Sequence, residues 1–168
     1  MPIRRLPILV LCLSTLCLST PYLLAARPAA AGAPAEGVPA CNYQPFEPGP
    51  GRLRMGWVTL DLGPSDNPKT PETWRGPIIL SRPDRSYCIT DLHTGVLQRP
   101  FFTDGQSFVM TTYAAEQQTV FFIDAASCRV LWKSPAFSGD VALTATVLHT
   151  GRKAWKLGPH CLPEADVP

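Results

Sequence analysis

The sequence carries little charge and has no extended helical periodicity. Charged residues make up 17% of the 168 residues and hydrophobic residues 45%, which is too apolar for a disordered chain. After residue 31, apolar residues never recur at helical spacing for more than two turns, and the sequence contains 19 prolines. A coiled coil and a helical bundle are therefore excluded, which leaves a turn-rich globular domain with an additional segment at one end.

Signatures of common catalytic and nucleotide-binding sites are also missing. The sequence has no Gly-x-Ser-x-Gly nucleophile motif and no glycine-rich phosphate loop of the required spacing. Basic residues do not form a stripe with interleaved aromatic residues, as they do in many nucleic-acid-binding proteins. We therefore expect no cofactor and no nucleic-acid partner.

Residues 1–31 have the organisation of a signal peptide. Arg4 and Arg5 provide a positive start, an apolar stretch follows, and small residues come next. Cleavage is expected after one of three alanines, Ala26, Ala31 or Ala33. The alternative is an uncleaved membrane anchor over residues 6–24, but two prolines bracket this stretch and four Ser or Thr residues dilute it. We expect a periplasmic or secreted protein without a stable membrane span in its mature form.

Removal of the signal peptide changes the charge balance. Cleavage after Ala31 removes Arg4, Arg5 and Arg27, so the 15 basic residues fall to 12 against 13 acidic ones. The basic character of the full sequence therefore belongs to the signal peptide. Charge gives no support for binding to a membrane surface.

Four cysteines remain after cleavage, and their even number favours two disulfides formed in an oxidising compartment. Buried free thiols are the alternative. The cysteines are too widely spaced for the paired ligands of a zinc site, so we expect no metal. Three pairings are possible. We favour Cys41 with Cys161, which would tie the ends of the domain, and Cys88 with Cys128, which would join neighbouring hairpins.

The mature chain divides into a tether and a β domain. Residues 32–50 are rich in Pro, Ala and Gly and are expected to be extended, with Cys41 strapping the end of this stretch to the body. Residues 51–168 contain about nine short runs of β type separated by turn residues. These runs predict an all-β domain of about nine antiparallel strands, arranged as a sandwich, barrel or meander. The runs are 53–62, 78–80, 86–90, 96–102, 107–113, 119–124, 129–133, 141–149 and 153–157.

One turn sequence is repeated. Leu-His-Thr-Gly occurs at 92–95 and again at 148–151, and the segment from Asp91 aligns with the segment from Asp124. In such a hairpin loop the Asp accepts backbone amides and the Gly adopts a left-handed conformation. Cys128 occupies the Gly position, which suggests that a disulfide pins this loop.

Residues 86–134 resemble a repeat blade of a quinoprotein-like or other Asp-Gly β-propeller. The resemblance lies in Asp104-Gly105 leading into two strands, then the turn from Asp124, then a strand ending in Leu131-Trp132. It covers about two hairpins, and its motifs are common ones. A closed propeller needs at least about four blades, so the resemblance implies hairpin geometry only and no cofactor or catalytic role.

Two loops are the candidate contact surface. In loop 63–77, Trp74 lies among loop-forming residues beside Arg75, a combination typical of binding hot spots. The alternative is that Trp74 packs the loop onto the sheet. Ser138, Gly139 and Asp140 form the second candidate loop, although these residue types are also favoured in any turn. We expect Trp57, Trp132 and Trp155 to be core residues.

Residues that could carry catalysis do not form a convincing set. Four turn carboxylates are candidates for a glycosidase pair, namely Asp104, Glu116, Asp124 and Asp140. His93 and His149 occupy equivalent places in the repeated turn, which explains their recurrence without a metal.

We therefore predict a non-enzymatic, exported binding protein of the bacterial envelope, of the inhibitor or immunity type, whose partner is another envelope or secreted protein. A structural or assembly subunit of an envelope complex and a hydrolase using acidic loop residues are the alternatives.

Overall fold

The computed structural model describes residues 40–92 and 95–164. The predicted signal peptide, its cleavage sites and His93 lie outside these residues. The described part contains thirteen strands, all paired antiparallel, and no helix, which confirms the predicted all-β class. No helix suited by length and apolarity to cross a membrane is found among the described residues.

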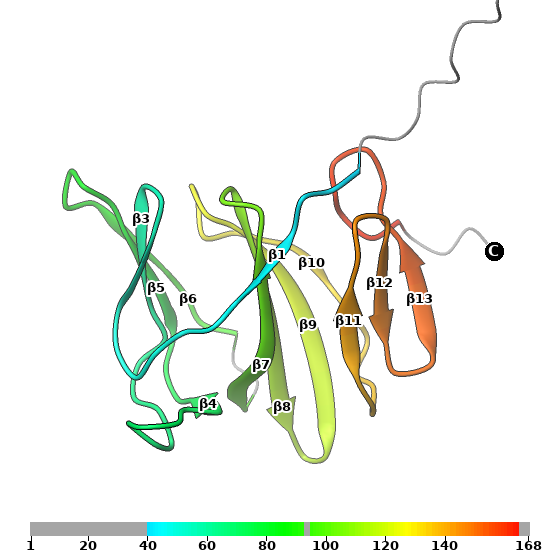
Figure 1. Ribbon diagram of the computed structural model, residues 1–168, viewed down its shortest axis with the longest axis horizontal. Helices are drawn as coiled ribbons and strands as arrows, with labels where there is room; N and C mark the ends of the chain where they lie inside the picture. Colours follow the sequence, from blue (N-terminus) through cyan, green and yellow to red (C-terminus); the bar gives the residue numbers. More distant parts are fainter. Residues whose placement is uncertain (1–39, 93–94, 165–168) are drawn as a thin grey trace, which may run out of the picture. The chain divides into compact units, whose positions relative to one another are not determined.

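The strands form three sheets (Figure 1). The N-terminal sheet has the order β2-β3-β5-β6, with bounds Leu53–Met55, Val58–Asp61, Ile78–Ser81 and Tyr87–Thr90. The central sheet has the order β1-β7-β8-β9-β10, with bounds Gln44–Phe46, Val96–Thr103, Ser107–Ala114, Gln117–Asp124 and Val130–Lys133. A short strand, β4 (Thr73–Trp74), also pairs with β7. The C-terminal sheet is β11-β12-β13, with bounds Val141–Leu143, Val147–Thr150 and Lys153–Lys156.

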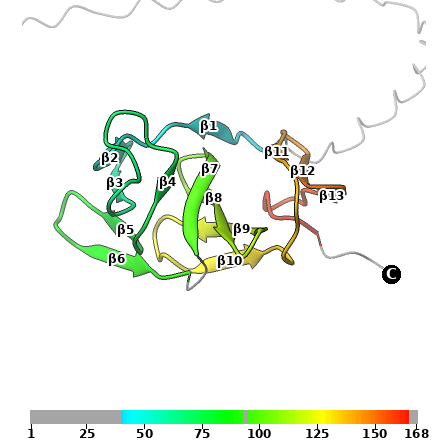
Figure 2. The same ribbon diagram turned by 90° about the horizontal axis from the view of Figure 1, so that it is seen from below.

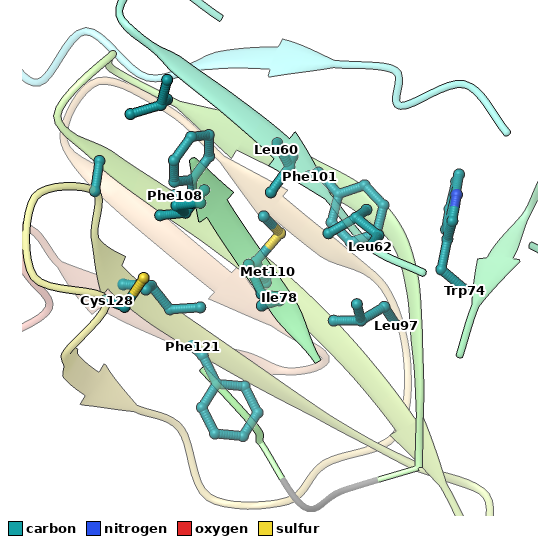
Figure 3. Packing of buried hydrophobic residues seen from close by; sticks show 14 residues of the cluster. Leu60, Leu62, Trp74, Ile78, Leu97, Phe101, Phe108, Met110, Phe121 and Cys128 are labelled. Atoms are coloured by element: carbon teal, nitrogen blue, oxygen red, sulfur yellow. The ribbon is translucent and has the colours of Figure 1, made fainter. Parts of the chain in front are cut away.

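The central sheet is covered on both faces. Because successive side chains of a strand point to opposite faces, Phe108 and Met110 of β8 enter one hydrophobic core and Val109 between them enters another. The first core packs the central sheet against the N-terminal sheet, and the second packs it against the C-terminal sheet. Figure 2 shows the three sheets in succession, and Figure 3 shows side chains of the first core. This double burial explains the unbroken apolar runs 108–110 of β8 and 120–123 of β9.

Four features raise the number of strands above the nine expected. The run 53–62 is a hairpin and not one strand, because Gly56 adopts a left-handed φ of 58° and turns the chain between β2 and β3. The run 141–149 is likewise divided into β11 and β12 by a turn at 144–146. Strand β4 lies within the predicted loop 63–77, and β1 lies within the predicted tether, paired with the edge of β7. Strands β1 and β4 are extended because both pair with β7, a strand outside their own local segments.

The predicted disulfides, Cys41–Cys161 and Cys88–Cys128, are both present. The first fastens the segment preceding β1 to the turn that follows β13, and the second joins β6 of the N-terminal sheet to the β9–β10 turn. Cys128 has a left-handed φ of 58°, as expected for a residue in the Gly position of the repeated turn. Two disulfides indicate a compartment outside the reducing cytoplasm.

The burial of the tryptophans differs from the prediction. Trp155 is buried and Trp132 is half-buried, and their rings meet edge to face, so both belong to the second core. Trp57, expected in the core, is 42% exposed. It lies in the β2–β3 turn, where its side chain is not committed to the inner face of the sheet.

Candidate binding loops

The base of loop 63–77 is fixed by Trp74. Its side chain is 0% exposed, its ring packs edge to face on Phe101 at 5.4 Å, and its Nε1 donates to the carbonyl of Gly49 at 3.1 Å. Trp74 is thus part of the first core (Figure 3) and is not presented to a partner. Of the two interpretations open at the sequence level, packing of the loop onto the sheet is the one observed.

Backbone hydrogen bonds close the loop above this anchor. Asp66 N donates to the carbonyl of Thr73 at 3.0 Å, and Arg75 N donates to the carbonyl of Pro64 at 2.8 Å. On the other side, β4 pairs with β7 through Thr73 and Gln98. The two ends of the loop are therefore held to each other, and the β4 end is also held to the central sheet.

The tip of the loop is exposed but internally ordered. Residues 66–70 are all exposed. Asn67 Oδ1 accepts the amide of Lys69 at 2.9 Å, and Asn67 Nδ2 donates to Thr70 Oγ1 at 3.0 Å. Asp66 Oδ1 accepts the amides of Glu72 and Thr73 at 3.0 and 3.1 Å. Such side-chain to backbone bonds define the tip without burying it.

A hollow of about 440 Å³ lies beside this loop. It is lined by Pro64, Ser65, Asp66 and the predicted contact residue Arg75. Arg75 is exposed. The hollow thus presents a cation and a carboxylate from the two sides of one loop.

The two amides that bind Asp66 lower the pKa of its carboxyl group. A lowered pKa in the folded loop means that this stabilisation is present above the ordinary Asp pKa and is lost as the pH falls through the lowered value. We expect the amide signals of Glu72 and Thr73 to titrate with a midpoint below that of an ordinary Asp, as followed by NMR. The Asp66→Asn variant, which keeps an acceptor oxygen but does not titrate, should lack this transition. A midpoint at the ordinary Asp value would contradict the assignment.

The second loop, 137–140, is held against neighbouring turns. Ser138 Oγ donates to the carbonyl of Glu116 at 3.3 Å, and Gln118 Nε2 donates to the carbonyl of Gly139 at 3.0 Å. Ser138, Gly139 and Asp140 are all exposed. In Figure 1 this loop and loop 63–77 lie at the same, lower end of the sheets, with the β8–β9 turn between them. The fold therefore places both predicted loops at one end of the domain.

The four candidate carboxylates lie at opposite ends of the central sheet. Asp104 and Asp124 belong to turns at one end, where each accepts backbone amides of its own turn. Glu116 and Asp140 belong to the other end, separated from the first pair by eight-residue strands of about 25 Å. His149 is exposed on β12. Among the described residues, no group of three or more His, Cys, Asp or Glu side chains is arranged to hold a metal ion.

Sequence reasoning did not single out the outer face of the N-terminal sheet. This face exposes Trp57, Tyr87 and Ile89. For Trp57 the missed signal was the Gly56-Trp57 pair, since a turn there changes the face assigned to every later residue of the run 53–62.

Comparison with known proteins gave no match, either to a protein-family model or to a curated protein.

Proposed function

We propose that this protein is an exported, non-enzymatic binding protein of the bacterial envelope, periplasmic or secreted, of the inhibitor or immunity type. The observation that carries the proposal is the construction of loop 63–77. Its tip is exposed, while its base is anchored by Trp74 in the core. Arg75 and Asp66 line the hollow beside it.

An inhibitory loop needs to be ordered before it binds its target. A loop that is already fixed loses little conformational freedom when it binds, so more of the contact energy appears as affinity. The hydrogen bonds of Asp66 and Asn67 supply that order at the tip, and β4 supplies it at the base. Loop 137–140, at the same end of the sheets, extends the surface.

The test first identifies a partner and then measures the partner's activity. The exported protein is immobilised, partners are captured from envelope extract and identified, and each purified partner is assayed with and without an equimolar amount of the protein. An inhibitor should lower the rate of a captured hydrolase. A captured partner that keeps full activity in the complex would instead favour a structural or assembly subunit.

Variants of the loop locate the contact. Arg75→Ala and Lys69→Ala remove exposed side chains, so each should weaken partner binding by about tenfold with little change in melting temperature. Lys156→Ala, on the outer face of the C-terminal sheet, is the matched control and should bind like the wild type. Equal affinity of all three variants, measured by calorimetry, would place the contact elsewhere.

We propose separately that residues 86–134 resemble a blade of a β-propeller. It is supported by the succession of antiparallel sheets that pack face to face along the chain. It concerns hairpin and sheet geometry and assigns no cofactor.

A further inference from the structure

The outer face of the N-terminal sheet carries large exposed apolar side chains beside the polar residues Thr59, Asp61 and Ser81. Tyr87 and Ile89 are 64% and 53% exposed, the highest values for large hydrophobic side chains in the described part of the chain. Ile79 lies directly opposite Ile89 in the β5–β6 pairing, on the same face. Trp57 lies near this face, with the guanidinium of Arg82 at 5.9 Å from its ring centre. We call these residues, together with Arg54, the aromatic-arginine face.

The side chains that line a depression on this face include two arginines. Arg54, Trp57, Thr59, Arg82 and Pro83 line a depression of about 220 Å³, which contains two guanidinium groups and no carboxylate. Arg82 also donates to the carbonyl of Ala126 and to Ser86, but these neutral acceptors leave its charge in place.

Two carboxylates lie near this depression, and both keep their negative charge. Asp61, on the same face, accepts from Arg52 Nε at 3.0 Å and from the amide of Gly63 at 2.9 Å. Asp84 accepts the amide and hydroxyl of Ser86 at 2.9 and 2.6 Å, and the nearby charge of Arg82 also helps to lower the pKa of its carboxyl group, so Asp84 offsets part of the charge of Arg82. Neither lines the depression.

The C-terminal sheet, which packs on the other side of the central sheet, has an outer face of different composition. The outer face of the C-terminal sheet carries a half-buried Val147 opposite Lys156, and its exposed residues Ala142, His149, Ala154 and Lys156 are small or polar. A sheet face in water normally carries such residues, whereas exposed Trp, Tyr and Ile side chains gathered on one face indicate contact with another molecule. The contrast within one protein singles out the N-terminal sheet.

We propose that the aromatic-arginine face is a second binding surface, distinct from loop 63–77, which takes an acidic protein segment bearing aliphatic or aromatic side chains. Trp, Tyr and Arg are the residues that dominate binding energy at protein interfaces. The two arginines select acidic groups, and Ile79 and Ile89 provide the apolar contact. A second copy of the chain fits less well, because a symmetric contact brings the same arginines together from both sides.

The probe is a fluorescein-labelled nine-residue peptide in which Glu alternates with Leu or Phe, and its control has Lys in place of Glu. Binding to the protein purified after export is followed by fluorescence anisotropy. We expect the Glu peptide to bind, with an affinity that falls as salt is raised, and the Lys peptide to bind at least about tenfold more weakly.

Matched variants assign the binding to this face. Arg54→Glu and Tyr87→Ala should each weaken binding of the Glu peptide about tenfold, while Lys156→Glu, an equal charge reversal on the C-terminal sheet, should not. Arg75→Ala should also leave peptide binding unchanged, which separates this surface from the proposed inhibitory loop.

Three results would overturn the proposal. These are equal binding of the two peptides, equal loss of binding in Lys156→Glu, and a Kd for the Glu peptide weaker than about 1 mM. Self-association in sedimentation that Tyr87→Ala abolishes would instead assign the face to a second copy.

Discussion

Replacing Trp74 with alanine should destabilise the protein by about 3–5 kcal/mol, the cost typical of removing a large aromatic side chain from a core. Trp74 is completely buried, it packs on Phe101, and it donates a hydrogen bond to Gly49. The substitution leaves a cavity and an unpaired carbonyl together, so both terms add. Equilibrium unfolding in urea measures the change.

Trp57→Ala is the matched control, because it removes the same side chain from an exposed turn. Trp57 is 42% exposed, so its loss should cost less than about 1 kcal/mol. A Trp74→Ala protein as stable as the wild type would contradict the burial of Trp74 and would return this residue to the contact surface.

Removing the Cys41–Cys161 disulfide should have an effect of similar size. The bond joins residues 120 positions apart, and the entropy of the unfolded chain that it suppresses corresponds to about 5 kcal/mol. The Cys41→Ser, Cys161→Ser protein should therefore unfold at much lower denaturant concentration. It should also be cleaved faster near residue 41 by a protease, since the disulfide strongly tethers that segment.

Cys88→Ser, Cys128→Ser provides the comparison. Its loop spans 40 positions, for which the same relation gives about 4 kcal/mol. This disulfide also pins a left-handed turn to β6. Addition of reductant to the wild type should reproduce the loss of both bonds, and a protein whose stability does not respond to reductant would contradict a stabilising role for the disulfides.

Loop 63–77 shows what composition could not predict. A Pro-rich loop with one Trp beside an Arg suggested either a hot spot or an anchor, and composition could not separate them. The choice depended on whether a cavity exists for the indole, and that cavity is built from Phe101 and other residues distant in the sequence. The sheet edge at β7, which pairs with β4, is likewise invisible from the loop itself.

The placement of Trp57 beside the aromatic-arginine face depended on one turn. Reading residues 53–62 as a single strand placed Trp57 inside, whereas the turn at Gly56 places it at the surface. Because strand side chains alternate with a period of two, one misplaced turn reverses the face assigned to each later residue of the run.

Local sequence by itself determined the all-β class, most of the strands and the left-handed turn at Cys128, because each depends on short-range pattern. The number of cysteines indicated two disulfides, but it left three pairings possible, and the fold selected the favoured one. Tertiary structure alone decided how three sheets stack, which tryptophans are buried and which face remains apolar. These outcomes depend on side chains from distant segments meeting in one core, and their free energy appears only when the segments are packed together.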